Sequence, residues 1–258
     1  MTRRCGLLVV FLSACAIVLG ACADRPAPNY GSINVDNYVR GAGAVAGFFT
    51  QPDPCTTVES LDRCELVECV KDDSGRYASA GTLTIVGTRE LISLAPSPDG
   101  AYGTFQSQNA LYAGGETLTF SAAGSDVPAF TGNIIAPAQM QIMSATVLPP
   151  GPGDFDPVIE KSQDFIVTWA APTFGTVEIM MADPVLEHQL RCRFETSAGT
   201  ATIPAATLMK LRTNLGWFAV GTLGTSELVA GDWSVKLRAG YEPTWSGGVT
   251  LSGQVAFH

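Results

Sequence analysis

The chain has 258 residues, with 24 acidic and 15 basic side chains, and a formal net charge of -9. This length corresponds to one large domain or two domains of ordinary size. The apolar fraction is 46% and the charged fraction 15%, which excludes a wholly disordered chain. The acidic balance argues against a nucleic-acid partner, because phosphate binding requires a basic surface. With 2 histidines, the chain offers little material for histidine-based catalysis or metal binding.

The N-terminal segment has the pattern of a secretory leader. Arg3 and Arg4 supply positive charge, and no charged residue follows from Gly6 to Ala23. A basic start followed by an apolar run is typical of a signal peptide. The alternative is a transmembrane helix, since the run is just long enough to span a bilayer.

The sequence Leu19-Gly20-Ala21-Cys22 favours the leader. It resembles a bacterial lipobox, which implies cleavage between Ala21 and Cys22 and attachment of lipid to the Cys22 thiol. Residues 1–21 would then be the signal peptide and 22–28 a polar tether. Ala23 follows the cysteine where an aspartate could stand, and this resembles lipoproteins sent to an outer rather than an inner membrane. We therefore expect a protein anchored in the cell envelope through its N-terminal lipid, on either face of that membrane.

A repeated heptapeptide indicates an internal duplication. The segment 79–85 reads SAGTLTI and the segment 197–203 reads SAGTATI, so one position differs. Weaker matches continue in the same order, including Gly115-Glu116 with Gly231-Asp232 and Cys69 with Cys192. We predict two related domains, 29–138 and 139–258, each near the common domain size.

The local pattern is that of β-structure. Ser234, Lys236 and Arg238 alternate with apolar neighbours, and short alternating runs are separated by Gly-Pro-Asp turns elsewhere in the chain. One short helix is expected over 204–211, where proline precedes good helix formers. We predict an all-β protein of two tandem antiparallel β-sandwiches, with the helix in the second. The strand rhythm resembles that of immunoglobulin and fibronectin type III domains.

Four cysteines remain beyond the lipobox, namely Cys55, Cys64, Cys69 and Cys192. An oxidising compartment permits disulfides among them. Cys69 and Cys192 occupy equivalent repeat positions, so we expect them to be small buried residues. The hypothesis is then a Cys55–Cys64 bridge, with Cys55–Cys69 as the alternative. The spacings and the lack of a nearby histidine argue against zinc.

No residue pattern identifies a catalytic centre, a metal site or a cofactor. His188 beside Glu187 could serve as a general base, but no partner nucleophile is evident, and a polar loop histidine is the better interpretation. His258 is the last residue, where disorder is common. The loop aspartates lack EF-hand spacing and are better explained as solvated turn residues, although a weak calcium site stays open. They are Asp72, Asp73, Asp154, Asp156 and Asp183.

The aromatic residues offer the candidates for ligand contact. Trp169 and Trp233 are in phase with apolar strand residues, which predicts that both are core. Trp245, Tyr241 and Tyr112 could stack against a sugar from loops, as aromatic residues do in many binding modules. At Trp245 packing is favoured over stacking, because its repeat counterpart is Phe130.

These observations lead to an expected function. The chain would be a non-catalytic, lipid-anchored envelope protein with a structural, adhesive or partner-presenting role. Its partner would be an envelope protein or a polysaccharide. The alternative is a lipoprotein that binds carbohydrate or a small ligand through its aromatic residues, and a hydrolase comes third.

Overall fold

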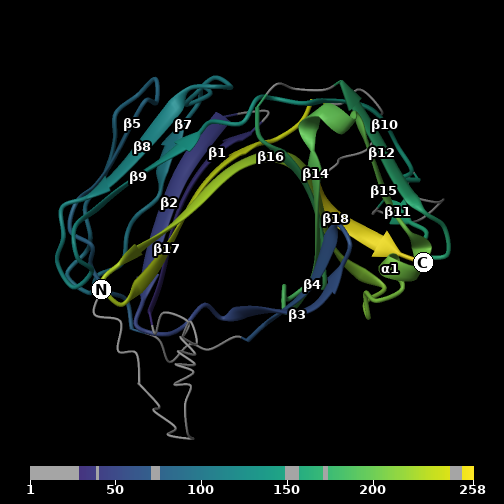
Figure 1. Ribbon diagram of the computed structural model, residues 1–258, viewed down its shortest axis with the longest axis horizontal. Coiled ribbons are helices and arrows are strands. Elements are labelled where there is room, and N and C mark those ends of the chain that lie inside the picture. The colour runs from purple at the N-terminus through teal and green to yellow at the C-terminus, as the bar shows by residue number, and fades with distance from the viewer. Residues whose placement is uncertain (1–28, 39–40, 71–75, 149–156, 171–173, 245–251) are drawn as a thin grey trace, which may run out of the picture.

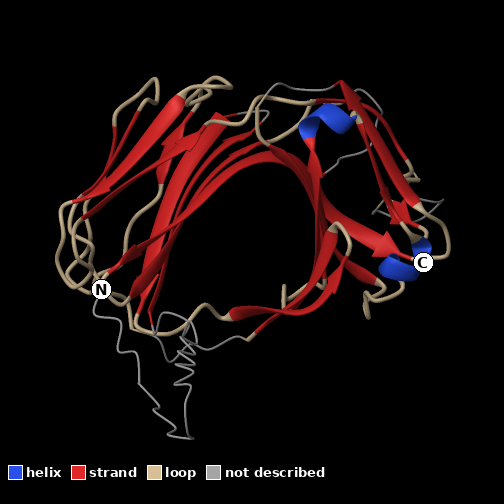
Figure 2. Ribbon diagram, in the orientation of Figure 1, coloured by secondary structure: helices blue, strands red, loops and turns tan. Residues whose placement is uncertain are grey.

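The computed structural model describes residues 29–38, 41–70, 76–148, 157–170, 174–244 and 252–258. Within these ranges almost all of the regular secondary structure is strand, which confirms the predicted all-β class (Figure 2). The predicted helix is also present, although α1 is shorter than expected and covers Ala205–Leu208. A 3₁₀ turn, η1, covers Thr196–Ala198.

A large curved sheet runs through the whole molecule (Figure 1). Its main path, in order across the sheet, is β3 (Cys55–Leu61), β4 (Cys64–Cys69), β14 (His188–Glu195), β13 (Thr176–Ala182), β16 (Leu215–Ala230), β17 (Trp233–Tyr241), β1 (Asn29–Tyr38), β2 (Gly41–Phe49) and β7 (Phe105–Ser107). A branch adds β18 (Ser252–Phe257) beside β16, and β11 (Val158–Ile159) beside β18. The β1–β17 and β11–β18 pairs are parallel, and the other pairs are antiparallel.

Two small sheets lie on the convex side of the large sheet (Figure 1). The first contains β6 (Ile92–Leu94), β5 (Leu83–Val86), β8 (Thr117–Ala122) and β9 (Phe130–Ile135). The second contains β10 (Gln141–Ala145), β12 (Phe165–Ala170) and β15 (Thr200–Ile203). Each small sheet covers a separate hydrophobic core, and we call the two units the first lobe and the second lobe.

Each lobe contains strands from both predicted segments. Val235, Leu237 and Ala239 of β17 belong to 139–258 but lie in the core of the first lobe. Conversely, the hairpin β3–β4 belongs to 29–138 and pairs with β14, so that Cys64 lies in the core of the second lobe. Neither core is therefore made by one segment alone.

One strand, β16, passes through both lobes. Phe218 and Val220 near its start pack in the second core, and Ala230 at its end packs in the first. The segment that connects the two small sheets crosses this strand midway, where the Thr222 hydroxyl donates to the Ala138 carbonyl at 2.7 Å. Gly224 lies beside the crossing, and a Cβ there would collide with the Ile135 carbonyl. A glycine therefore allows the connecting backbone to lie directly on the sheet.

The repeated heptapeptide has the same local structure in both places. Gly81 and Gly199 both adopt left-handed backbone angles, with φ of 72° and 67°. The following strands, β5 and β15, both alternate exposed or half-buried threonines with buried apolar residues. The next matched strands differ in their partners, because β8 pairs with β5 whereas β17 pairs with β16 and β1.

The cysteine pairing proposed above is wrong. The structure contains a Cys55–Cys69 bridge, which was the alternative, and a Cys64–Cys192 bridge. The strand register explains both, since Cys55 lies opposite Cys69 in the β3–β4 hairpin and Cys64 lies opposite Cys192 across β4 and β14. Cys64 faces Leu61 within the hairpin, so Cys55 is out of its reach. The expectation that Cys69 and Cys192 are unpaired was also wrong.

Candidate functional site

The concave face of the large sheet is a polar groove. Along β1, buried Ile33 and Val35 point into the first core, while the alternate residues Ser32, Asn34 and Asp36 point to the opposite side. A strand places successive side chains on opposite faces, so one strand serves both the core and the groove. The same alternation in β13, β14, β16 and β17 carries the groove across both lobes.

The groove encloses a cavity of about 860 Å³. This volume lies in the range of about 300–1,000 Å³ that is typical of ligand sites. Its charged side chains come from both lobes and from the hairpin β3–β4. They are Asp36, Asp53, Glu65, Glu178, Arg191, Arg193, Glu227, Lys236, Arg238 and Glu242.

Lys236 and Asp53 hold the first-lobe wall to the segment that precedes β3. The Lys236 ammonium lies 2.5 Å from Asp53 Oδ2 and 5.5 Å from the centre of the Tyr30 ring. Burial acts to lower the pKa of Lys236, but the hydrogen bond and charge of Asp53, together with the charges of Tyr30 and Glu227, outweigh it, so the pKa is raised above its ordinary value. The lysine therefore remains charged at neutral pH and keeps its partner.

Asp36 and Arg238 form a second charged group on the same wall. Asp36 lies opposite Gly240 in the β1–β17 register, and a Cβ at Gly240 would collide with its carboxylate. Burial raises the pKa of Asp36, and the nearby Arg238 partly offsets that increase. Tyr38, at the end of β1, has a raised pKa because its partial burial and the Asp36 charge both disfavour the phenolate. This end of the groove can therefore offer an acceptor, a cation and a phenol to a ligand.

Arginines dominate the second-lobe wall. Arg193 Nε lies 3.1 Å from Glu178 Oε2, and its Nη1 lies 4.0 Å from Glu65 Oε2. Arg191 donates from Nε and Nη2 to the Gln189 Oε1 at 2.9 and 2.7 Å. Within the described ranges, Arg191 and Arg238 have no carboxylate oxygen at ion-pair distance. Both guanidinium groups line the cavity, Arg191 bound to Gln189 and Arg238 near Asp36.

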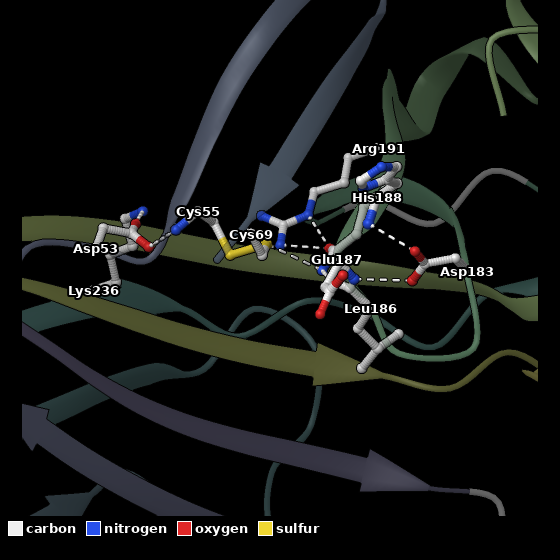
Figure 3. Close-up of a disulfide and its surroundings, with 10 residues drawn as sticks. Asp53, Cys55, Cys69, Asp183, Leu186, Glu187, His188, Arg191 and Lys236 are labelled. Carbon is white, nitrogen blue, oxygen red and sulfur yellow. Dashed lines mark hydrogen bonds and ion pairs between the residues drawn. A yellow bond between two sulfur atoms is a disulfide. The ribbon is translucent and has the colours of Figure 1, made fainter. Parts of the chain in front are cut away.

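Residues 50–54 lead from β2 to β3 and so join the lobes beside the groove. At the start of this segment the Thr50 N–H donates to the Arg76 carbonyl at 3.0 Å. At its other end the Cys55–Cys69 bridge ties β3 to β4 (Figure 3). Gln189 Nε2 approaches Cys69 Sγ at 3.3 Å, which connects the bridge to Arg191. The disulfide thus forms part of the groove wall.

The aromatic residues predicted to contact a ligand lie in different environments. Tyr112 is fully buried, and its hydroxyl donates to the Gly240 carbonyl, so the expectation that it stacks on a ligand was wrong. Tyr241 is half-buried, packs edge-on against Tyr112 and borders the groove. Trp245 and Cys22 lie outside the described residues. The predicted core positions of Trp169 and Trp233 are confirmed, with 4% and 5% exposure.

Sequence reasoning missed most of the groove. The polar face of Ser234, Lys236 and Arg238 was recognised, but the matching face of β1 was not assigned to a site. The alternation Tyr30-x-Ser32-x-Asn34-x-Asp36 was the available signal. Nothing in the sequence shows that this strand lies beside β17.

His188 opens β14 and borders a second, smaller cavity of about 240 Å³ with Asp183 and Arg212. Its Nδ1 is buried without a hydrogen-bond partner in the described structure. The Asp183 carboxylate accepts from the backbone N–H groups of Glu187 and His188 at 2.8 and 3.3 Å. Asp183 therefore serves as the cap of a turn. In the parts of the chain that the structure describes, no cluster of three or more His, Cys, Asp or Glu side chains is placed to hold a metal.

No protein-family model matches the chain, and no curated protein matches it. None of the helices in the described ranges has the length and apolar character needed to cross a membrane.

Proposed function

We propose that this protein is a non-catalytic binding protein of the cell envelope that holds a polar partner in the groove of its large sheet. The observation that carries the proposal is the cavity of about 860 Å³ with charged side chains on two opposing walls. A sheet face with no partner would need only scattered solvated charges. Here Arg191 and Arg238 line a concave site, and among the described residues neither has a carboxylate oxygen at ion-pair distance. Concave sites with a few convergent polar groups are the usual place for ligands.

The anchor would be a lipid on Cys22. Because Ala23 follows this cysteine, as in lipoproteins sent to an outer membrane, we take the outer membrane to be its location. Residues 22–28 would form the tether, and β1 begins directly after them at Asn29. Seven extended residues span at most about 25 Å. The groove would therefore lie close to the membrane surface, within reach of envelope polymers and of membrane proteins.

Photocrosslinking in intact cells tests the groove. A photoreactive amino acid at Asn34, which lines the groove, should capture a partner. The matched control is Thr202, an exposed residue on the outer sheet of the second lobe. Capture at Thr202 equal to that at Asn34, or none at Asn34, would count against the proposal.

The anchor has a separate test. Cys22→Ser should abolish incorporation of a labelled fatty acid and leave the leader uncleaved. Continued labelling would show that another residue carries the lipid.

A carbohydrate is the second candidate for the partner, because Tyr30, Tyr38 and Tyr241 all border the groove. Tyrosine rings can stack on sugars while their hydroxyls remain hydrated. Tyr38→Ala should weaken binding of soluble envelope glycans. Tyr77→Ala is the matched control, since both rings are 52% exposed and Tyr77 lies outside the groove. Equal loss in both variants would remove the carbohydrate candidate.

A further inference from the structure

The groove contains an open strand edge. Among the residues that the structure describes, β3 is the last strand of the large sheet on its side, and β4 is its one strand partner. Cys55 and Thr57 of β3 both line the cavity. An edge strand carries unpaired main-chain donors and acceptors, which natural proteins usually cover or protect. Here part of that edge opens into the proposed binding site.

The hydrogen bonds around Cys55 show which way the edge faces. Val70 N–H donates to the Pro54 carbonyl at 2.9 Å, so residue 54 faces β4. Cys55 N–H turns to the opposite side and donates to Asp53 Oδ1 at 3.0 Å. Main-chain direction alternates along a strand, so the N–H and carbonyl of Thr57 also face away from β4.

Asp53 shows that this open edge faces the first lobe. One of its oxygens accepts from Cys55 N–H, and the other lies 2.5 Å from the Lys236 ammonium on β17. Its carboxylate therefore bridges the β3 edge and the opposite wall of the groove (Figure 3). At Cys55 N–H, the Asp53 carboxylate oxygen takes the place of the carbonyl that a neighbouring strand would supply. A strand laid beside Thr57 would lie in the cavity between the two walls.

The remainder of β3 is protected against pairing. The register shifts between Thr57 and Glu59, which is a β-bulge, and Glu59 is bound by Lys210 at 2.9 Å. Bulges and charges are devices that prevent edge-to-edge association. The open part of the edge is thus limited to Cys55–Thr57, the part that lines the groove.

We infer that the occupant of the groove is an extended polypeptide segment of the partner, which adds a short strand to β3 at Thr57. This inference rests on the proposed function. Main-chain hydrogen bonds to Thr57 and to the Cys55 carbonyl would fix the register, as in other cases of strand addition. Arg191 and Arg238 would contact its polar side chains. A polysaccharide has no main-chain N–H ladder with which to match this edge.

The test uses a library of random dodecapeptides selected on the oxidised, full-length protein, and the tightest peptide then serves as the probe. Thr57→Pro removes the N–H that faces the groove but leaves the bonds to β4 in place. We expect it to weaken probe binding about tenfold or more. Thr57→Val is the matched control, because it keeps the N–H and the shape, and it should bind as the wild type does. Retained affinity in Thr57→Pro would overturn the inference.

A second measurement covers the case in which Thr57→Pro does not fold. Probes with a single ester in place of one backbone amide are bound to the wild-type protein. At least one ester position near the centre should weaken binding markedly, whereas no effect at any position would overturn the inference.

The result also separates the inference from the proposed function. Selection of no peptide, together with glycan binding that Arg238→Ala abolishes, would overturn the polypeptide and leave the groove as a binding site. If no peptide is selected, no glycan binds and Asn34 captures no partner, the proposed function itself would be wrong.

Discussion

The two faces of the large sheet differ in what they do, although the same strands make both. The convex face presents apolar residues to the two cores, and the concave face presents charges to the groove. Each face also carries one disulfide, since Cys64–Cys192 lies in the second core and Cys55–Cys69 borders the groove. The comparison indicates that stability and binding are separated by strand alternation, so changes to one face should leave the other largely intact.

The largest effect on stability should come from the core disulfide. Cys64→Ala with Cys192→Ala opens a cross-link between residues 128 apart. Bridges of this span contribute about 5 kcal/mol through the entropy of the unfolded chain. Urea unfolding should therefore show a decrease of about that size in the free energy of unfolding, while the folded protein still binds its probe in the groove. A decrease below about 1 kcal/mol would show that the core on the convex face does not depend on the bridge.

A matching test in the first lobe is Phe48→Ala. Phe48 is fully buried and contacts the rings of Tyr102, Phe130 and Trp233. Truncation of a buried phenylalanine costs about 3–5 kcal/mol because a cavity remains. Because β16 runs through both cores, calorimetry should show a single transition at a lower temperature. Separate transitions would indicate that the shared strand β16 does not couple them.

The groove disulfide should have a smaller effect on stability and a larger one on binding. Cys55→Ala with Cys69→Ala opens a loop with a sequence separation of 14. A loop of this length corresponds to about 3 kcal/mol. Because the bridge fixes the β3 edge beside Asp53, probe affinity should fall as well. Unchanged affinity would show that the hairpin holds its place without the bridge.

The smallest effect should come from Asp36, and it should depend on pH. Burial raises its pKa in the folded protein, so the folded state binds the proton more tightly than the unfolded state. Stability then falls as pH rises above the ordinary carboxyl value of about 4. Asp36→Asn should raise the free energy of unfolding at pH 7 and have little effect below pH 4. A decrease at pH 7 would show that the ionised carboxylate is held by Arg238.

Local pattern predicted the elements of this protein but not their partners. The alternation in 233–241 identified a strand with one apolar face and one polar face, and the structure has both. The burial of Trp169 and Trp233 followed from the same phase. These features depend on neighbours in the sequence, and period-two alternation reports them directly.

The groove and the disulfides depend on contacts between distant residues. β1 pairs with β17 about two hundred residues later, and the hairpin β3–β4 pairs with β14. Propensity and periodicity do not identify such partners. The repeat was also misleading at Cys69 and Cys192, since equivalence of position favoured unpaired roles for two residues that are each bridged to another strand.

The position of β1 gives the proposed anchor a mechanical consequence. β1 pairs along nine positions with β17 and along nine with β2, and it begins where the tether would end. A pull on a partner in the groove would be opposed at the lipid, and the load would enter the molecule through the first residue of this central strand. Strand hydrogen bonds lie across the direction of such a force. They would therefore resist it together in shear, rather than open one after another from an end.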